Sequence, residues 1–303
     1  MGEKRTAAAV AAVIGGAALL GASTLGAVAP RVGDSHVDAR WARMKRYRYA
    51  HRGLHGRVTG VPENSLAAFE RARDNGFGAE MDVRLTKDDR LVVFHDADTT
   101  RMCGVSGAIE DMTLDQVRAL RLGGTDERIP TFEEAISVFD YEGPKNELDE
   151  LDVDGSGVAT PVIVEIKTAN GNFKRLTDLV METLDRHCVS FCIQSFDLYV
   201  LSRLRWHRPE VIRGRLAYDV RHGKALALPV RFVRTMLTGN HAARPDFIAY
   251  RFEDRKLPVV RMVVGPMGAK PVYWTIRTEA DLRECEAEGG VAIFEGFLPD
   301  PTC

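Results

Sequence analysis

Short apolar runs alternate with amphipathic stretches along most of the chain beyond residue 45. Helical patterns, with apolar residues three and four positions apart, lie between most of the apolar runs. Strands that alternate with helices in this way are typical of a parallel α/β sheet. Two irregular stretches, 97–112 and 142–160, interrupt the alternation. The expected strands span residues 47–51, 79–85, 91–95, 162–166, 191–194, 212–217, 247–249, 272–276 and 291–294.

Several expected helices begin at residues that suit a helix start. Asn64 or Ser65 can cap the first of them, because a short polar side chain accepts a hydrogen bond from the first turn. Thr131 followed three positions later by Glu134 matches a capping box. The expected helices span residues 66–74, 135–139, 173–187, 198–207 and 279–288.

The second and third expected strands are separated by only five residues. A parallel crossover needs about a dozen residues or more, so these two strands should form an antiparallel hairpin. With the hairpin counted as one barrel strand and an excursion, eight strands remain, the number in a (β/α)8 barrel. A turn centred between Asp88 and Asp89 pairs residues whose numbers sum to 177, which places Asp82 opposite His95. The sequence therefore predicts an α/β fold, a (β/α)8 barrel with a hairpin excursion and short insertions.

Residues 6–30 form a run without a charged side chain, preceded by Lys4 and Arg5. As a helix this run would be about 37 Å long, more than the roughly 30 Å hydrocarbon core of a bilayer. It predicts an N-terminal hydrophobic helix that spans the membrane once as an uncleaved anchor. A cleaved signal peptide is the alternative, since residues 27–29 match a small-x-small site. Pro30 would then be the first mature residue, which is a poor context for cleavage.

Basic side chains favour one orientation of this anchor. Six lysines or arginines follow the run within residues 31–48, whereas two precede it. The positive-inside rule then places the body of the protein in the cytoplasm, with secretion after signal cleavage as the second possibility. We divide the chain into residues 1–44, an anchor or signal segment with its linker, and residues 45–303, the barrel domain.

The composition excludes several classes of protein. With 41 basic and 43 acidic residues the net charge is −2, which is no footprint for nucleic-acid binding. Beyond the N-terminus no uncharged run approaches the length of a membrane span, so a polytopic membrane protein is excluded. The five cysteines are scattered without metal-ligand spacing, and neither a zinc site nor a disulfide framework is indicated.

Three carboxylates stand inside expected core strands. Glu80 and Asp82 are two positions apart on one strand and therefore share a face, and Glu165 lies on another strand. With Lys167 as the cation nearest in sequence, these like charges would be costly to bury unless a divalent cation neutralised them. Oxygen ligands favour Mg²⁺ or Ca²⁺ over zinc.

Other candidate groups stand at the ends of expected strands. His51 and His95 each end a strand, and the carboxyl ends of the strands build the active site of a (β/α)8 barrel. Histidine titrates near neutrality, and the guanidinium of Arg52 suits phosphate oxygens. Trp274 lies on a further strand, and most of the other six histidines are expected at the surface or at helix ends. A metal, two histidines and an arginine indicate acid–base hydrolysis of a phosphoester.

A series of short motifs extends this picture. They are His51-Arg52-Gly53, Pro62-Glu63-Asn64-Ser65, Glu80-Met81-Asp82-Val83-Arg84, Phe94-His95-Asp96, Ile129-Pro130-Thr131-Phe132-Glu133, Val164-Glu165-Ile166-Lys167, Gln194-Ser195-Phe196-Asp197 and Trp274-Thr275. In these residues and their order the chain resembles the glycerophosphodiester phosphodiesterases, from about residue 47 to residue 299. The resemblance implies a TIM barrel that hydrolyses glycerophosphodiesters to sn-glycerol 3-phosphate and an alcohol, with a divalent cation.

The resemblance also implies three groups of site residues: an acid–base pair, a trio that holds Mg²⁺ or Ca²⁺, and a substrate-binding set. These are, in that order, His51 and His95; Glu80, Asp82 and Glu165; and Arg52, Glu63, Lys167 and Trp274. The implied partners are a small glycerophosphodiester and, through the N-terminal segment, a membrane.

Two segments near the expected substrate, residues 96–104 and 294–299, depart from the usual family pattern. The identity of the alcohol is therefore left open. One alternative is a phospholipase or lysophospholipase D-type phosphodiesterase that acts on membrane lipid. Another is a non-catalytic barrel that binds a sugar phosphate. That barrel would lack a histidine or a carboxylate of the set, and none is missing here.

Overall fold

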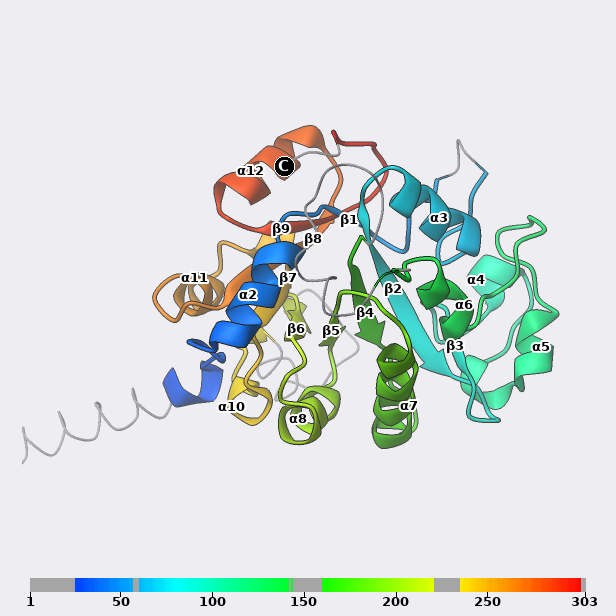
Figure 1. Ribbon diagram of the computed structural model, residues 1–303, viewed down its shortest axis with the longest axis horizontal. Helices are drawn as coiled ribbons and strands as arrows, with labels where there is room; N and C mark the ends of the chain where they lie inside the picture. Colours follow the sequence, from blue (N-terminus) through cyan, green and yellow to red (C-terminus); the bar gives the residue numbers. More distant parts are fainter. Residues whose placement is uncertain (1–24, 57–59, 142, 144–159, 221–234, 301–303) are drawn as a thin grey trace, which may run out of the picture.

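The computed structural model describes residues 25–56, 60–141, 143, 160–220 and 235–300. Within these ranges eight parallel strands form a closed barrel, because β1 pairs with both β2 and β9 (Figure 1). This arrangement confirms the predicted (β/α)8 barrel. The strands, with β3 as an antiparallel excursion from β2, are β1 (Tyr49–Ala50), β2 (Gly78–Leu85), β3 (Leu91–Val93), β4 (Val162–Ile166), β5 (Phe191–Ser195), β6 (Arg213–Ala217), β7 (Phe247–Arg251), β8 (Lys270–Ile276) and β9 (Val291–Phe294).

The hairpin of β2 and β3 is confirmed, but its predicted register is wrong by one residue. The two strands pair residues whose numbers sum to 176, not 177. The loop between them has an odd number of residues, so the pairing centres on Asp88 itself, and Asp89 closes the turn in the left-handed conformation (φ 58°). The partner of Asp82 is therefore Phe94, whose backbone N–H donates to the Asp82 carbonyl at 2.9 Å, and His95 lies one position beyond.

Helices cover the outside of the barrel. Ser65, not Asn64, caps α3, accepting a hydrogen bond from the Ala68 N–H. The capping box of Thr131 and Glu134 at α6 is confirmed. The helices outside the β3 insertion are α2 (Ser35–Met44), α3 (Leu66–Asp74), α6 (Phe132–Ser137), α7 (Phe173–Arg186), α8 (Leu198–His207), α10 (Asn240–Ala243), α11 (Pro258–Val264) and α12 (Glu279–Ala287), with a 3₁₀ turn at η3 (Phe252–Asp254).

Helix α2 closes one end of the barrel interior, and the sequence did not predict it. Its residues Val37, Trp41 and Met44 pack with inward-facing strand residues in one apolar cluster. The Trp41 indole stacks on Phe247 with ring centroids 5.4 Å apart. Phe247 in turn occupies space beside Gly214, where a Cβ would lie 1.9 Å from its ring. The segment that precedes β1 thus completes the core.

Most of the predicted membrane span over residues 6–30 lies outside the described residues. Its last few residues are described, and Val28 is buried against the barrel domain. The Asn240 side-chain amide donates to the Val28 carbonyl at 2.9 Å, and Arg31 forms a two-pronged ion pair with the buried Asp246. In the described ranges no helix is both long and apolar enough to cross a membrane.

The insertion after β3 forms a small structured lobe beside α3 and α6 (Figure 1). It has its own apolar cluster, which includes Ile109 and Val117. Nearly all of the other irregular stretch, 142–160, lies outside the described residues. The elements of the insertion are α4 (Thr100–Cys103), η1 (Ile109–Asp111) and α5 (Leu114–Arg118).

Candidate active site at the mouth of the barrel

A cavity of about 470 Å³ opens at the carboxyl ends of the strands. Every predicted site residue except Asp82 lines it, and Asp82 lies directly beside Glu80 and Glu165. The structure therefore brings together all the side chains that the sequence singled out, although they come from six different strands or loops. This convergence follows from the barrel, because parallel strands end at one common mouth.

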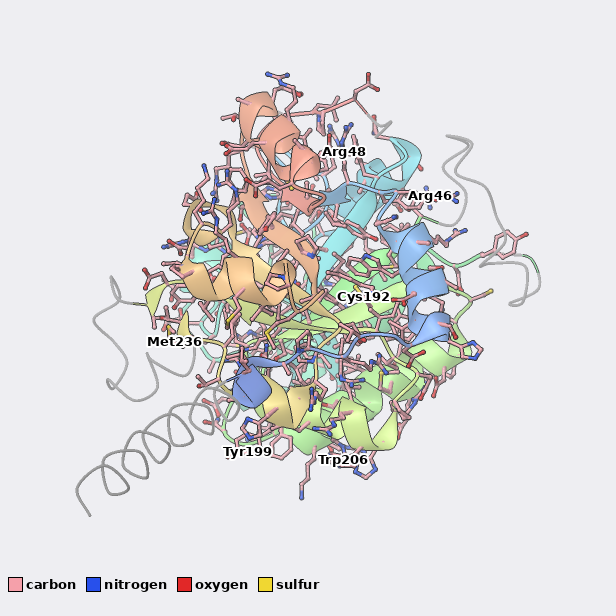
Figure 2. The ribbon with its side chains drawn as sticks, turned by 90° about the vertical axis from the view of Figure 1, so that its left-hand side faces the viewer. Arg46, Arg48, Cys192, Tyr199, Trp206 and Met236 are labelled. Carbon is pink, nitrogen blue, oxygen red and sulfur yellow. The ribbon has the colours of Figure 1, made fainter. Side chains whose placement is uncertain are left out.

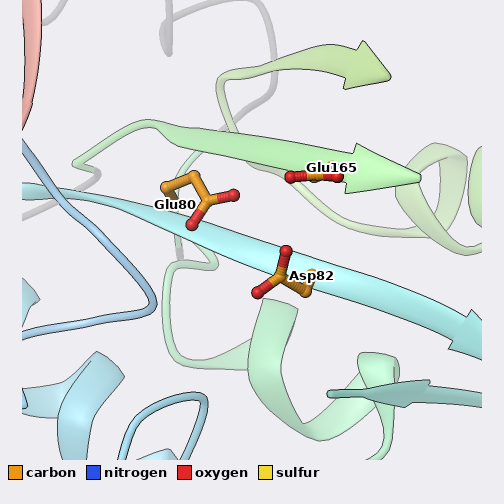
Figure 3. A group of neighbouring side chains, drawn as sticks. All are labelled: Glu80, Asp82 and Glu165. Carbon is orange, nitrogen blue, oxygen red and sulfur yellow. The ribbon is translucent and has the colours of Figure 1, made fainter. Parts of the chain in front are cut away.

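Three buried carboxylates form the centre of the site. Glu80 and Asp82 come from β2, and Glu165 from the neighbouring β4, where it pairs in register with Asp82. Figure 3 shows the three carboxylates converging between the two strands. One oxygen from each lies within 4.8 Å of the others. Three buried oxygen donors this close match the ligand set of a hard divalent cation such as Mg²⁺ or Ca²⁺.

Neighbouring amides orient two of these carboxylates, and the sequence prediction missed both amides. The Asn64 side chain donates to Asp82 at 2.8 Å, and the Gln194 side chain donates to Glu80 at 3.3 Å. The backbone N–H of Arg52, held in a left-handed conformation (φ 57°), donates to the second oxygen of Glu80 at 3.1 Å. Both amides belong to motifs that resemble the family, and this could have identified them as site residues from the sequence.

The electrostatics of the trio are uneven. Burial, together with the charges of the other two carboxylates, raises the pKa of Glu80 well above its usual value, and burial also raises that of Glu165. Burial opposes ionisation of Asp82 as well, but the charges of Lys167, His95 and Arg52 outweigh it and hold its pKa below the usual value. The nearby cations thus do not fully offset the negative charge of the three carboxylates, as expected of a cation-binding pocket.

The two predicted phosphate-binding cations contact carboxylates. Lys167 Nζ lies 2.7 Å from Glu165 and 3.2 Å from Asp82. Arg52 lies 2.7 Å from Glu63 through Nη1 and 3.5 Å from Asp82 through Nε. Arg52 Nε is buried without a hydrogen-bond partner among the described residues, so it remains available to a ligand oxygen.

Each of the two histidines is held by a carboxylate. His51 Nδ1 lies 2.7 Å from Glu295, and His95 Nδ1 lies 2.6 Å from Asp96. Both contacts leave Nε2 as the free ring nitrogen. Burial lowers the pKa of both histidines below the usual value, with the charge of Arg52 adding to the effect. The hydrogen bond to His51 lowers the pKa of Glu295 to about 2.

Arg101, in the β3 insertion, is a site residue that the sequence prediction did not include. Its guanidinium contacts Glu63 and Asp96, each at 2.5 Å, and so ties the insertion to the mouth of the barrel. Its position in residues 96–104, a segment near the expected substrate, could have identified it from the sequence.

His55 is an exception among the histidines outside the predicted pair, most of which were expected at the surface or at helix ends. It is half-buried beside the site, and its Nε2 has no hydrogen-bond partner among the described residues. Burial lowers its pKa, and its strongest charged neighbours are Glu295 and Glu63.

The family model described as "Glycerophosphoryl diester phosphodiesterase family" matches residues 51–293. This chain belongs to that family. The match begins at His51, directly after β1, and ends one residue before the last residue of β9, so it covers the barrel from β2 almost to its end and every predicted site residue.

A curated relative and two solved structures agree. A glycerophosphodiester phosphodiesterase of Caldanaerobacter subterraneus is 40% identical over 129 residues, which are 40% of this chain and 51% of that relative. The match thus spans about half the length of that relative. An Oleispira antarctica phosphodiesterase superposes with a TM-score of 0.65 at 23% identity, over 84% of this chain and 94% of the other. A Thermotoga maritima glycerophosphodiester phosphodiesterase gives 0.58 at 24%, over 82% and 94%. At these identities the two structures show a shared fold.

Proposed function

We propose that this protein is a phosphoric diester hydrolase that converts glycerophosphodiesters to sn-glycerol 3-phosphate and an alcohol. The observation that carries the proposal is the buried trio of Glu80, Asp82 and Glu165 at a cavity that also presents His51 and His95. Membership of the family supports the reaction type. The Oleispira antarctica neighbour, solved in complex with the product sn-glycerol-3-phosphate, supports the choice of product.

The trio would hold one divalent cation, Mg²⁺ or Ca²⁺. When bound, such an ion supplies positive charge that stabilises the extra negative charge on phosphate oxygens in the transition state. The chain itself supports this role through the amides of Asn64 and Gln194, which hold two of the three carboxylates in place.

The two histidines would move the protons. One histidine, neutral and unprotonated at Nε2, accepts a proton from the attacking water, or from the glycerol hydroxyl if a cyclic phosphate forms first and water then opens it. The other histidine, protonated on both ring nitrogens, donates its Nε2 proton to the leaving alkoxide, so that the alcohol departs neutral. Glu295 and Asp96 fix the Nδ1–H tautomers, which keeps each Nε2 turned to the substrate. Burial lowers the pKa of both histidines, which favours the neutral ring that the base needs; the acid takes up a second proton, at Nε2, before it donates it.

The cations would bind the phosphate. Arg52 has a buried Nε without a hydrogen-bond partner in the described ranges, and Lys167 lines the same cavity. Glu63, which pairs with Arg52 and Arg101, borders the side on which the glycerol hydroxyls would bind. Trp274 is held by a hydrogen bond from Nε1 to the Ala249 carbonyl at 3.0 Å and also lines the cavity.

Histidine variants test the proposal. His51→Asn and His95→Asn should each lower the kcat for release of sn-glycerol 3-phosphate by about 10²–10⁴-fold. His207→Asn, at the exposed end of α8, is the matched control and should retain wild-type turnover. If either site variant turned over glycerophosphodiesters as fast as the control, the acid–base roles would be wrong.

We further propose that the apolar run over residues 6–30 anchors the enzyme in a membrane, with the barrel in the cytoplasm. Support comes from the uncharged run behind Lys4 and Arg5 alone; Val28 and Arg31 are bound to the barrel domain, so the part of the run inside the membrane would end before them. Membrane fractionation followed by protease treatment of intact cells checks both points.

Activity on lysophosphatidylcholine above that on glycerophosphocholine would favour the phospholipase alternative over the proposed activity.

A further inference from the structure

Two aromatic side chains project from one outer side of the barrel. Among the large apolar side chains of the described residues, Tyr199 at 69% and Trp206 at 71% are the most exposed. Both belong to α8 and lie about two helical turns apart, so they share one face of the helix. Figure 2 shows them at the same edge of the molecule. Exposed tryptophan and tyrosine are typical of the membrane–water interface, where the ring and its polar atom both find suitable surroundings.

The start of the described chain lies on the same side of the molecule. Arg205 of α8 donates from Nη1 to the carbonyls of His241 and Ala242 at 2.7 and 3.1 Å, and these two residues belong to α10. Helix α10 also binds the N-terminal segment, since the Asn240 amide donates to the Val28 carbonyl at 2.9 Å. The three segments therefore lie side by side (Figures 1 and 2). We call the outer side formed by residues 25–33, 198–209 and 235–245 the arginine–aromatic face.

The arginine–aromatic face has a one-sided charge. Its three segments contain five arginines and no aspartate or glutamate. Arg205 and Arg244 donate to backbone carbonyls, so these bonds leave their positive charge without a carboxylate. The Arg205 guanidinium lies 4.6 Å from the centre of the Trp206 ring. Positive charge and an exposed aromatic ring thus occur together at this place.

The proposed anchor reaches the barrel domain without a linker. The uncharged run extends to Pro30, but the chain is already bound to α10 at Val28. A segment that leaves the bilayer just before Val28 would therefore hold the surface around α10 close to the lipid headgroups. That surface is the arginine–aromatic face.

We propose that the arginine–aromatic face docks on the surface of an anionic phospholipid bilayer, with Tyr199 and Trp206 at the level of the headgroups. Arginines near a bilayer are attracted to anionic lipids, and the aromatic rings are stabilised at the interface. The inference rests on the membrane anchor proposed above. It adds which side of the barrel lies on the membrane and which lipid charge that side prefers.

This docking would leave the active site open to water. Arg31 pairs with Asp246, whose carboxylate also accepts a hydrogen bond from the backbone N–H of Arg213 at 2.9 Å. Arg213 begins β6 and Asp246 directly precedes β7, so these contacts lie at the amino ends of the strands. The cavity lies at their carboxyl ends. The attachment and the mouth are thus at opposite ends of the barrel, and the mouth would not face the bilayer.

Tryptophan fluorescence tests the docking, because the three tryptophans of the chain have different surroundings. Trp206 is exposed on the arginine–aromatic face, Trp41 is buried, and Trp274 lines the cavity. The proposed anchor contains no tryptophan. The full-length protein is reconstituted into vesicles of equal parts phosphatidylcholine and phosphatidylglycerol that carry bromine on the acyl chains close to the headgroup.

We expect the brominated lipid to quench the wild-type fluorescence, and Trp206→Phe to lose nearly all of this quenching. Trp274→Phe is the matched control, since it removes the other partly exposed indole, and it should keep the quenching. An unquenched wild type, or quenching that survives in Trp206→Phe, would overturn the proposal. If the wild type is unquenched and sedimentation in detergent shows a dimer that Trp206→Phe dissociates, the face is instead a contact between two copies of the chain.

The lipid composition tests the role of the arginines. In vesicles of phosphatidylcholine alone, brominated to the same degree, quenching of Trp206 should be weaker, because the arginines lack an anionic partner. Equal quenching in the two kinds of vesicle would refute the preference for anionic lipid.

The experiment also separates this inference from the earlier proposals. Quenching requires no turnover, so it decides the docking even if the protein hydrolyses no glycerophosphodiester. Flotation of the vesicles after an alkaline wash reports the anchor by itself. Protein that floats but is not quenched keeps the anchor and refutes the docking, whereas protein that neither floats nor is quenched refutes both.

Discussion

Glu80 is the carboxylate whose replacement reports most directly on the acidic trio. Among the described residues, Asp82 and Glu165 each have a cationic side chain within 4.0 Å, whereas Glu80 has none that close. Its hydrogen bonds come from the Arg52 backbone and the Gln194 amide. Glutamine has nearly the same shape and keeps an acceptor oxygen, so Glu80→Gln removes the charge with little change in packing.

The expected gain in stability follows from the spacing. Two negative charges 4.8 Å apart, the limit for the trio's ligand atoms, repel by roughly 3.5 kcal/mol at an effective dielectric constant of 20. Lost attraction to Arg52 and Lys167 offsets much of the relief, so we expect metal-free Glu80→Gln to be more stable than wild type by about 1–3 kcal/mol at pH 7. This corresponds to a Tm higher by several degrees.

The pH dependence has a definite sign. Because the pKa of Glu80 is raised on folding, the metal-free folded state binds a proton more tightly than the unfolded state does. Wild-type stability should therefore fall as the pH rises from the ordinary carboxyl range through the raised pKa. Glu80→Gln lacks this component and should show a correspondingly smaller decline over the same window.

The same substitution should remove the stabilisation by a divalent cation. At a concentration 100 times its Kd, a bound cation stabilises the wild type by about 2.7 kcal/mol, and the Tm rises accordingly. Scanning calorimetry in EDTA and then in Mg²⁺ or Ca²⁺ measures both effects, with the exposed Glu182→Gln on α7 as the matched control. The reasoning is refuted if Glu80→Gln is less stable than the control in EDTA, or if it keeps the full response to the cation.

Three further predictions concern neighbouring parts of the molecule. Glu295→Gln removes a negative charge that raises the pKa of His51, so the limb of the kcat/KM–pH profile that reports His51 should move to lower pH; an unchanged profile would contradict this. Trp41→Ala should cost about 3–5 kcal/mol in urea unfolding, because it empties the closed end of the barrel, and a loss below about 1 kcal/mol would refute that packing role. Arg101→Ala frees Glu63 and should raise KM with little change in Tm; a fall in Tm without a change in KM would mean a structural role.

The barrel could be predicted because the patterns that specify its strands and helices lie within short stretches of the sequence. Apolar runs and their spacing placed the strands within two or three residues of the structure, and α3 and α8 agree with their predicted ranges. The hairpin followed from the shortness of one connection. Its register did not, because one residue more or less in a turn shifts every pair, and nothing local showed that Asp89 would take the left-handed conformation.

Helix α2 was missed for a physical reason. Its sequence has an N-capping Asp34 and apolar residues at positions 37, 41 and 44, a helical spacing. That pattern is short, and its meaning depends on the barrel end that it covers. A linker and a capping helix differ in what they pack against, which the local sequence does not show.

The site residues likewise divide into those that the sequence could predict and those that it could not. The trio could be predicted because burying charge on a core strand costs free energy, so a carboxylate inside an apolar run stands out in the sequence. The two histidines could be predicted because they stand at the ends of such runs. Asn64, Gln194 and Glu295 were not chosen, since their roles depend on contacts across the barrel with residues 18, 114 and 244 positions away. An uncharged amide in a strand gives no such local signal.

One measurement tests the central claim most directly: release of sn-glycerol 3-phosphate from glycerophosphodiesters by the purified full-length protein, with and without EDTA. The account predicts release in the presence of Mg²⁺ or Ca²⁺, its loss in EDTA, and its return when the cation is restored in excess. Absence of product with the cation present would contradict the proposed activity. Turnover that EDTA leaves unchanged would contradict the role of Glu80, Asp82 and Glu165 as a metal site.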